Sequence, residues 1–307
     1  MNNLPPAGTR PRRLAAFAPS PAEPLPHQLL AALAQHRMAT TAQLQTLLRP
    51  HAARQTISAP LNRLHTHGLI GYTVLPRSHG KRAWYLTTDG ARLTRDWPYL
   101  HHRPHPITTP TAASMKTPHV LTVVRAHLAF ITDARRRHDE HGYLDWTPEV
   151  AHPLSNNERI IADALMYYVL HRADGSRTKL RALIEVDRAT TSSERLATKL
   201  IDYARLHTYT PTPPGRRPPT HTTPLWQRWY PVFPRILFIL TGASPTTLTH
   251  RIDDLQAMTA HHPAVTQLAH TVPLGAATLH DLEHHHPTSP IWTPLNSQGP
   301  HRSWTAL

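Results

Sequence analysis

Apolar residues recur at helical spacing in three consecutive segments near the start of the chain. In the third segment, Ile57, Leu61 and Leu64 stand at positions i, i+4 and i+7, which places them on one face of a helix. Two short strand-like runs follow, LIGYTVL and AWYLTT, and a turn rich in basic residues joins them. The pattern therefore predicts three short helices followed by a β-hairpin.

The rest of the chain mixes helical spacing with continuous β-rich runs. Two such runs flank Asp174-Gly175, a dipeptide typical of a tight hairpin turn. The expected elements, in order, are a helix at 119–138, strands at 146–154, 162–170 and 180–186, a helix after Ser193, a buried strand at 235–242, a helix at 246–259 and a strand at 271–274. Helices on a sheet of several strands indicate the mixed α/β (α+β) class.

Changes in composition mark the ends of these patterned regions. Residues 1–26 are rich in Pro, Ala and Arg and are expected to form a disordered basic arm, and residues 96–117, rich in Pro, His and Thr, an interdomain linker. This division leaves one domain at 27–95, a second at 118–293 and a tail at 294–307.

The net charge of the chain indicates which class of partner it binds. The 33 Lys and Arg residues against 19 Asp and Glu residues give a formal net charge of +14 at pH 7, so a polyanion such as double-stranded DNA is expected. Cysteine is absent, which excludes disulfides, Cys-ligated zinc and a thiol nucleophile. Since no apolar run is long enough to span a bilayer, we expect no membrane partner and a cytoplasmic location.

The helices and hairpin of residues 27–95 resemble the winged helix-turn-helix DNA-binding domains of bacterial regulators. The resemblance implies that the third helix enters the major groove and that the hairpin turn lies along phosphates. A winged helix used only for protein contacts is the alternative. The candidate DNA-binding residues are Arg54, Gln55, Ser58, Asn62 and Arg63 on the helix and Arg77, Lys81 and Arg82 in the turn.

Acidic residues cluster at one end of the second hairpin. Asp163 opens its first strand, and Glu185 and Asp187 close its second strand on one face, because strand side chains alternate. Lys199 follows on the next helix. Three carboxylates near one lysine suit Mg²⁺ or Mn²⁺ and metal-assisted phosphodiester cleavage. The alternative is structural: the acids pair with arginines, and Lys199 is a solvated helix residue.

The order helix, three strands, helix, strand is similar to the core of the PD-(D/E)XK nuclease-like fold. That resemblance implies that Asp163 and Glu185 bind the metal. Asp187 stands where the pattern expects a lysine, and Lys199, on the following helix, is the candidate to replace it.

The whole arrangement resembles the replication-relaxation family of bacterial plasmid and mobile-element proteins. The segments that carry this resemblance, besides the winged helix, are HVLTV from His119, WTPE from Trp146, IADA from Ile161, EVDR from Glu185, KLIDY from Lys199 and PIW from Pro290. The family implies DNA binding in plasmid replication or DNA relaxation, with other replication or transfer proteins as partners. Two functions stay open: a Mg²⁺-dependent endonuclease or nickase, and a non-catalytic replication accessory or transcriptional regulator with a degraded nuclease domain.

Overall fold

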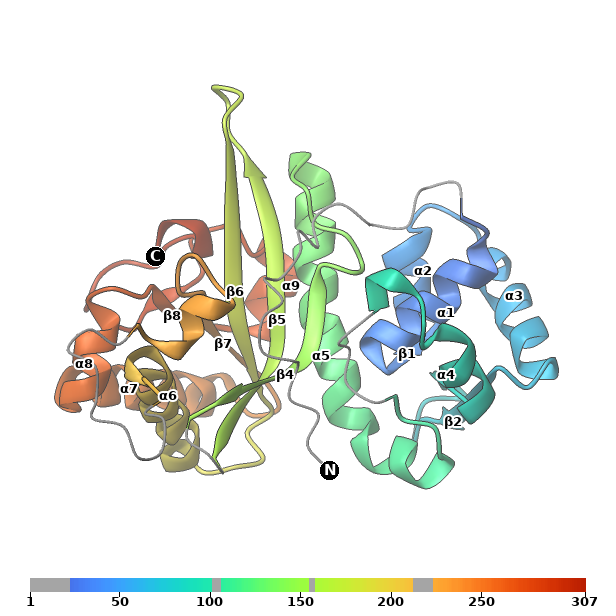
Figure 1. Cartoon of the computed structure of the whole chain (residues 1–307), viewed down its shortest axis with the longest axis horizontal. Coiled ribbons are helices and arrows are strands. Elements are labelled where there is room, and N and C mark those ends of the chain that lie inside the picture. Colours follow the sequence, from blue (N-terminus) through green and yellow to red (C-terminus); the bar gives the residue numbers. More distant parts are fainter. Residues whose placement is uncertain (1–22, 101–105, 155–157, 212–222) are drawn as a thin grey trace.

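The protein is a mixed α/β structure with two sheets on either side of a long central helix (Figure 1). The computed structural model describes residues 23–100, 106–154, 158–211 and 223–307. The predicted basic arm at 1–26 lies almost entirely outside the described residues. None of the helices in these ranges is both long and apolar enough to cross a membrane.

The N-terminal unit combines four helices with a small antiparallel sheet. The sheet has the order β1-β3-β2. Its first strand has only three residues, too few for a period-2 pattern to reveal, and the sequence did not predict it. Its position is set by Thr40, which ends the strand and forms a capping box with Gln43 at the start of the next helix. The elements are α1 (Leu25–His36), β1 (Met38–Thr40), α2 (Thr41–Leu48), α3 (Arg54–Thr66), β2 (Ile70–Val74), β3 (Arg82–Leu86) and α4 (Thr88–Thr94).

Helix α3 begins earlier than its sequence suggests. The sequence predicts Thr56 as the N-cap with Pro60 in the first turn, but the cap is Ala53 and the proline lies in the second turn. Pro60 therefore removes one intrahelical hydrogen bond. The apolar stripe is as predicted, since Ile57 and Leu61 are fully buried.

The second sheet has six strands in the order β4-β5-β6-β7-β8-β9. The first three strands are antiparallel, and β6, β7 and β8 are parallel. One face packs against α5 and α9 and the other against α6, α7 and α8. The elements are α5 (Pro110–Arg137), β4 (Trp146–Pro153), β5 (Arg159–His171), β6 (Arg177–Asp187), α6 (Ser193–Thr208), β7 (Arg235–Leu240), α7 (Pro245–His261), α8 (Pro263–Ala269), β8 (Leu274–Thr278), α9 (Leu279–His285) and β9 (Thr293–Pro294), with short 3₁₀ helices at Pro98–Leu100, Leu225–Arg228 and Trp304–Ala306.

Helix α5 joins the two units more closely than a linker would. It begins at Pro110, inside the predicted linker at 96–117, and its Val124 and Ile131 belong to the apolar cluster of the N-terminal unit. The amide of Gln43 also donates to the carbonyl oxygen of Leu121 on α5, at 2.9 Å. The chain's last residues pack as well, because Trp304, in the predicted tail, is fully buried. Apolar burial thus crosses the boundaries that composition suggested.

Candidate functional site

The site is built where β5 separates from β6. Their ladder pairs Ala164 with Ile184 but extends no further toward the start of β5. The side chain of Asp163 replaces the missing backbone partner, since its Oδ2 accepts a hydrogen bond from the backbone N–H of Val186 at 2.7 Å. This contact fixes the carboxylate beside the end of β6, where Glu185 lies.

Glu185 is held by two residues of α6. Lys199 donates to Oε2 of Glu185, and the Tyr203 hydroxyl donates to Oε1 at 2.5 Å. The two donors stand four residues apart and therefore share one face of the helix. Ser192 caps this helix, and buried Leu200 and Tyr203 fix its rotation.

The carboxyl of Glu185 is only 2% exposed. Burial, reinforced by the negative charge of Asp163, raises its pKa to about 7, although Lys199 and Tyr203 act in the opposite direction. Glu185 therefore changes its charge near neutral pH.

Asp163 has a second partner on the central helix. His119 of α5 lies with Nε2 at 3.1 Å from Oδ1 of Asp163. Burial acts to raise the pKa of Asp163, but the hydrogen bond to His119 and the charge of Lys199 outweigh it and hold the pKa below its ordinary value. The same hydrogen bond raises the pKa of His119. Asp163 is thus a carboxylate that already has cationic neighbours.

Asp187 is directed to a different helix. Its Oδ2 accepts from Nε of Arg251 on α7 at 2.7 Å, and its Oδ1 accepts from the backbone N–H of Ala189 at 3.1 Å. Both members of the ion pair are buried, with 8% of the Arg251 side chain and 5% of the Asp187 side chain exposed. Asp187 therefore fastens the end of β6 to α7.

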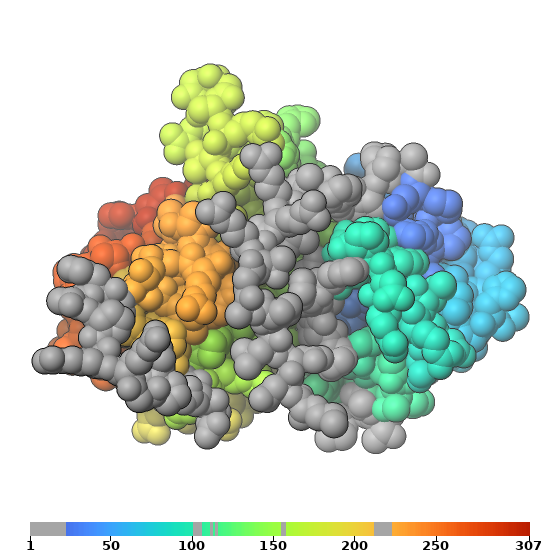
Figure 2. Space-filling model, in the orientation of Figure 1, coloured from blue at the N-terminus to red at the C-terminus, as the bar shows by residue number. Residues whose placement is uncertain are grey.

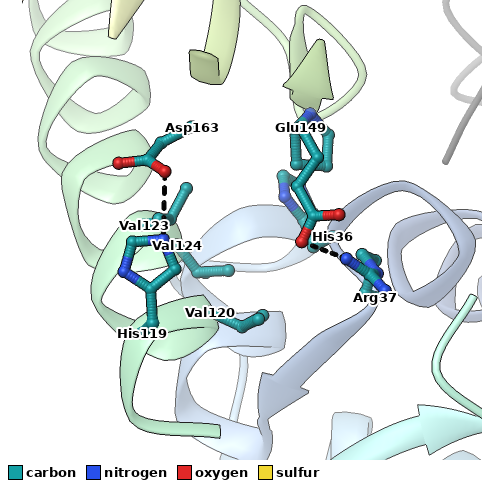
Figure 3. Close-up of a pocket in the computed structure, with 9 residues that line it drawn as sticks. His36, Arg37, His119, Val120, Val123, Val124, Glu149 and Asp163 are labelled. Atoms are coloured by element: carbon teal, nitrogen blue, oxygen red, sulfur yellow. Dashed lines mark hydrogen bonds and ion pairs between the residues drawn. The ribbon is translucent and has the colours of Figure 1, made fainter. Parts of the chain in front are cut away.

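A pocket lies beside Asp163, between the N-terminal unit and the sheet. Figure 3 shows His119 and Asp163 along one side of it and an ion pair between Arg37 and Glu149 along the other. Arg37 follows α1 and Glu149 lies in β4, and both have positive φ, +67° and +50°. Such angles are uncommon for non-glycine residues and occur often at functional sites.

The partners of Asp163, Glu185 and Asp187 show whether these side chains are arranged to bind the predicted Mg²⁺ or Mn²⁺. The structure brings Asp163, Glu185 and Lys199 together, whereas Asp187 points to Arg251. Each carboxylate already has its own donors, and the described residues contain no group of three or more His, Asp or Glu side chains arranged to hold a metal ion. As arranged, Asp163, Glu185 and Asp187 do not fit Mg²⁺ or Mn²⁺, and their catalytic assignment stays a prediction.

The candidate DNA-binding residues lie on one unit. Their two groups are connected, because Nη1 of Arg82 donates to Oδ1 of Asn62 at 3.3 Å and its guanidinium lies 4.2 Å from the centre of the Tyr72 ring. Ser58 is half-buried. The exposed candidates are Arg54, Gln55, Asn62 and Arg63 on α3 and Arg77, Lys81 and Arg82 at the turn between β2 and β3.

Sequence reasoning did not assign site roles to His119, Tyr203, Arg37 or Arg251. Tyr203 had a signal, since it stands four residues after Lys199. His119 is one of 26 histidines, and its spacing from Asp163 carries no pattern. Arg251 contacts Asp187 across a separation of 64 residues, which no local pattern predicts.

Comparison with known proteins gives a single assignment. No curated protein and no solved structure matches the chain. A family model described as replication-relaxation matches residues 30–215, more than half of the chain. The matched span holds the N-terminal unit from within α1, the central helix, and the strands and helix that carry Asp163, Glu185 and Lys199. The chain belongs to the replication-relaxation family.

Proposed function

We propose that this protein binds double-stranded DNA through α3 and the β2–β3 turn, in plasmid replication or DNA relaxation. The observation that carries the proposal is the charge of the N-terminal unit: residues 24–88 contain no Asp or Glu. A surface with cations and no carboxylates attracts the phosphate backbone. The stretch holds seven cations, of which Arg37 is buried in its ion pair with Glu149. The other six are Arg49, Arg54, Arg63, Arg77, Lys81 and Arg82.

The geometry of the unit supports the same surface. Helix, strand, two helices and a two-stranded hairpin is the order of a winged helix, in which the third helix reads bases and the turn contacts phosphates. Helix α3 keeps its apolar stripe inward and exposes Arg54, Gln55 and Arg63. The bond between Arg82 and Asn62 holds the turn beside that face.

The contacts of the carboxylates favour binding without cleavage. Lys199, His119 and Arg251 each contact one of the three acids of the predicted metal site, so each carboxylate has a basic side chain of this chain as its partner. We propose that the second domain acts as a non-catalytic platform on bound DNA, with other replication or transfer proteins as its partners.

Replacing Arg77, Lys81 and Arg82 together with alanine is expected to weaken duplex binding and to reduce its salt dependence. Each phosphate contact contributes about 0.9 to the slope of log affinity against log salt, so loss of three contacts lowers the slope by about 2.7. Fluorescence anisotropy with a labelled duplex over a salt series measures both quantities. The charge-matched control replaces Arg195, Arg228 and Arg302, which are exposed elsewhere.

Substitution of Arg54 or Gln55 is expected to change which sequence is preferred, because contacts to base edges carry specificity. If the wild type binds no duplex at low salt, or if the turn variant and its control lose the same slope, the proposed surface is wrong.

Mg²⁺ and Mn²⁺ are expected to leave the melting temperature of the wild type unchanged. An ion that binds only the folded state would raise it, but each oxygen of Asp163 and Glu185 already accepts a hydrogen bond, from a donor that the ion would have to displace or share the oxygen with. Differential scanning fluorimetry with and without each ion measures this. A metal-dependent rise that disappears in Asp163→Asn and Glu185→Gln, together with nicking of supercoiled plasmid, would restore the nuclease prediction.

A further inference from the structure

The hairpin of β5 and β6 extends well beyond the sheet. Pairing with β4 ends at Met166 and pairing with β7 begins at Ala182. In the described residues, the backbone of the 167–181 ribbon therefore pairs mainly with itself, apart from one bridge between Glu140 and Val169 and a hydrogen bond from the N–H of Tyr167 to the carbonyl oxygen of Asp145. Figures 1 and 2 show it projecting from the body of the molecule. The base of the ribbon packs on the core through Tyr168, Leu170 and Leu180, whereas residues 171–177 are all exposed. Since a two-stranded ribbon is barely stable in water by itself, core packing does not explain this outer part.

The tip of this ribbon is a defined turn. The backbone N–H of Arg172 donates to the carbonyl oxygen of Ser176 at 3.0 Å, and Gly175 has a φ of +79°, which a glycine adopts without strain. The carboxylate of Asp174, the single acid between residues 167 and 181, accepts from the backbone N–H of Ser176 at 2.8 Å. Asp174 therefore stabilises the turn, and Arg172 remains exposed beside it.

The ribbon carries a row of cations on one face. Arg177, Lys179 and Arg181 alternate along β6, so their side chains point the same way and lie about 6.8 Å apart. Arg177 and His171 share the carboxylate of Glu140. Lys179 is exposed and has no ion pair among the described residues, and Arg181 lies over the ring of Tyr167 at 5.4 Å. The row keeps a net positive charge after these contacts.

We propose that the tip and the cationic face of the 167–181 ribbon form a second DNA-contacting surface that binds duplex phosphates. The inference rests on the proposed DNA binding and adds a contact outside the N-terminal unit. A projecting β-ribbon is narrow enough to lie in or along a groove, and its arginines and lysine supply backbone contacts without sequence preference. Binding through both surfaces makes the second contact intramolecular, which raises the overall affinity.

Crosslinking tests the ribbon directly, because the chain has no cysteine and a single introduced thiol is unique. The full-length variants Ala173→Cys at the ribbon tip, His79→Cys at the β2–β3 turn and Ala260→Cys on exposed α7 each receive a photoactivated crosslinker. With duplex DNA, Ala173→Cys is expected to crosslink several-fold more than Ala260→Cys and comparably to His79→Cys.

The three cysteine variants distinguish DNA contact by the ribbon from DNA binding by the N-terminal unit. If His79→Cys crosslinks while Ala173→Cys matches Ala260→Cys, the ribbon inference is overturned and DNA binding by the N-terminal unit stands. If none of the three crosslinks, both are overturned.

A charge variant gives an independent readout. Lys179→Ala with Arg181→Ala is expected to lower the log–log salt slope by about 1.8, since two phosphate contacts are lost. The control, Arg195→Ala with Arg302→Ala, removes the same charge from exposed positions elsewhere. Equal slopes for these two variants would overturn the inference.

Discussion

Replacing Lys199 with methionine is expected to lower the free energy of unfolding by about 1.4 kcal/mol at pH 8 and by about 2.7 kcal/mol at pH 9. The substitution keeps the volume of the stem but leaves the carboxyl of Glu185, which is 2% exposed, without its cation. Because the unpaired carboxyl can take up a proton instead of staying charged, the loss is limited to about 1.4 kcal/mol for each pH unit above the pKa of about 7. Urea unfolding followed by circular dichroism measures the loss. Lys179→Met, the same change on the exposed ribbon, is the control and is expected to have little effect.

The pH dependence of this loss identifies its cause. The pKa of Glu185 is raised from 4.5 to about 7 in the folded protein. Below about pH 4.5 the carboxyl is protonated in both states and its burial carries no charge penalty. Stability is lost as the pH rises through about 7, by roughly 3 kcal/mol in all. Without Lys199 the pKa rises further, so the Lys199→Met variant is expected to approach the wild type at pH 5.

The double variant Lys199→Met with Glu185→Gln separates charge from packing. It removes the buried charge together with its partner, so it is expected to recover most of the stability that Lys199→Met loses. Its unfolding free energy is also expected to be flat between pH 5 and pH 8 relative to the wild type. A loss that is equal at both pH values and persists in the double variant would show that Lys199 acts through packing.

The helices and strands that could be predicted are those with a local sequence pattern. Ile57, Leu61 and Leu64 repeat with helical period, and Asp174-Gly175 marks a hairpin, so α3 and the β5–β6 ribbon followed from the sequence. Strand β1 and the early start of α5 did not, because both depend on partners far along the chain. Composition suggested a linker at 96–117, but apolar contacts of α5 with the N-terminal unit decide the structure there.

In the candidate site, too, only the features set by a local pattern could be predicted. Alternation along β6 predicted that Glu185 and Asp187 share a face, and both indeed contact helices on the same side of the sheet, α6 and α7. Alternation does not predict which cationic side chain contacts each carboxylate. Lys199 reaches Glu185 because the stripe of Leu200 and Tyr203 rotates α6 toward the sheet. His119 and Arg251 come from elements distant in sequence. Arg251 holds Asp187 away from the cluster, whereas Asp163, Glu185 and Lys199 stay together and His119 adds a partner for Asp163.

Replacing Arg251 with methionine is expected to destabilise the protein by about 3–5 kcal/mol, because Asp187 would remain buried without its cation. Urea unfolding measures the change. Arg125→Met is the matched control, since Arg125 makes a similar bond to Glu283 but with 47% of its side chain exposed, and such surface pairs contribute about 1 kcal/mol or less.

A second substitution, at Asp187, distinguishes a structural role of this residue from a metal-binding role. If Asp187 is the structural partner of Arg251, then adding Asp187→Asn to Arg251→Met removes the unpaired charge and recovers most of the lost stability. A metal ligand behaves differently: Arg251→Met would free the carboxylate for a cation, and Mn²⁺ would then raise the melting temperature of that variant above the wild type's response. A loss below about 1 kcal/mol in Arg251→Met, or such a response to Mn²⁺, would return Asp187 to the cation site that the sequence predicts.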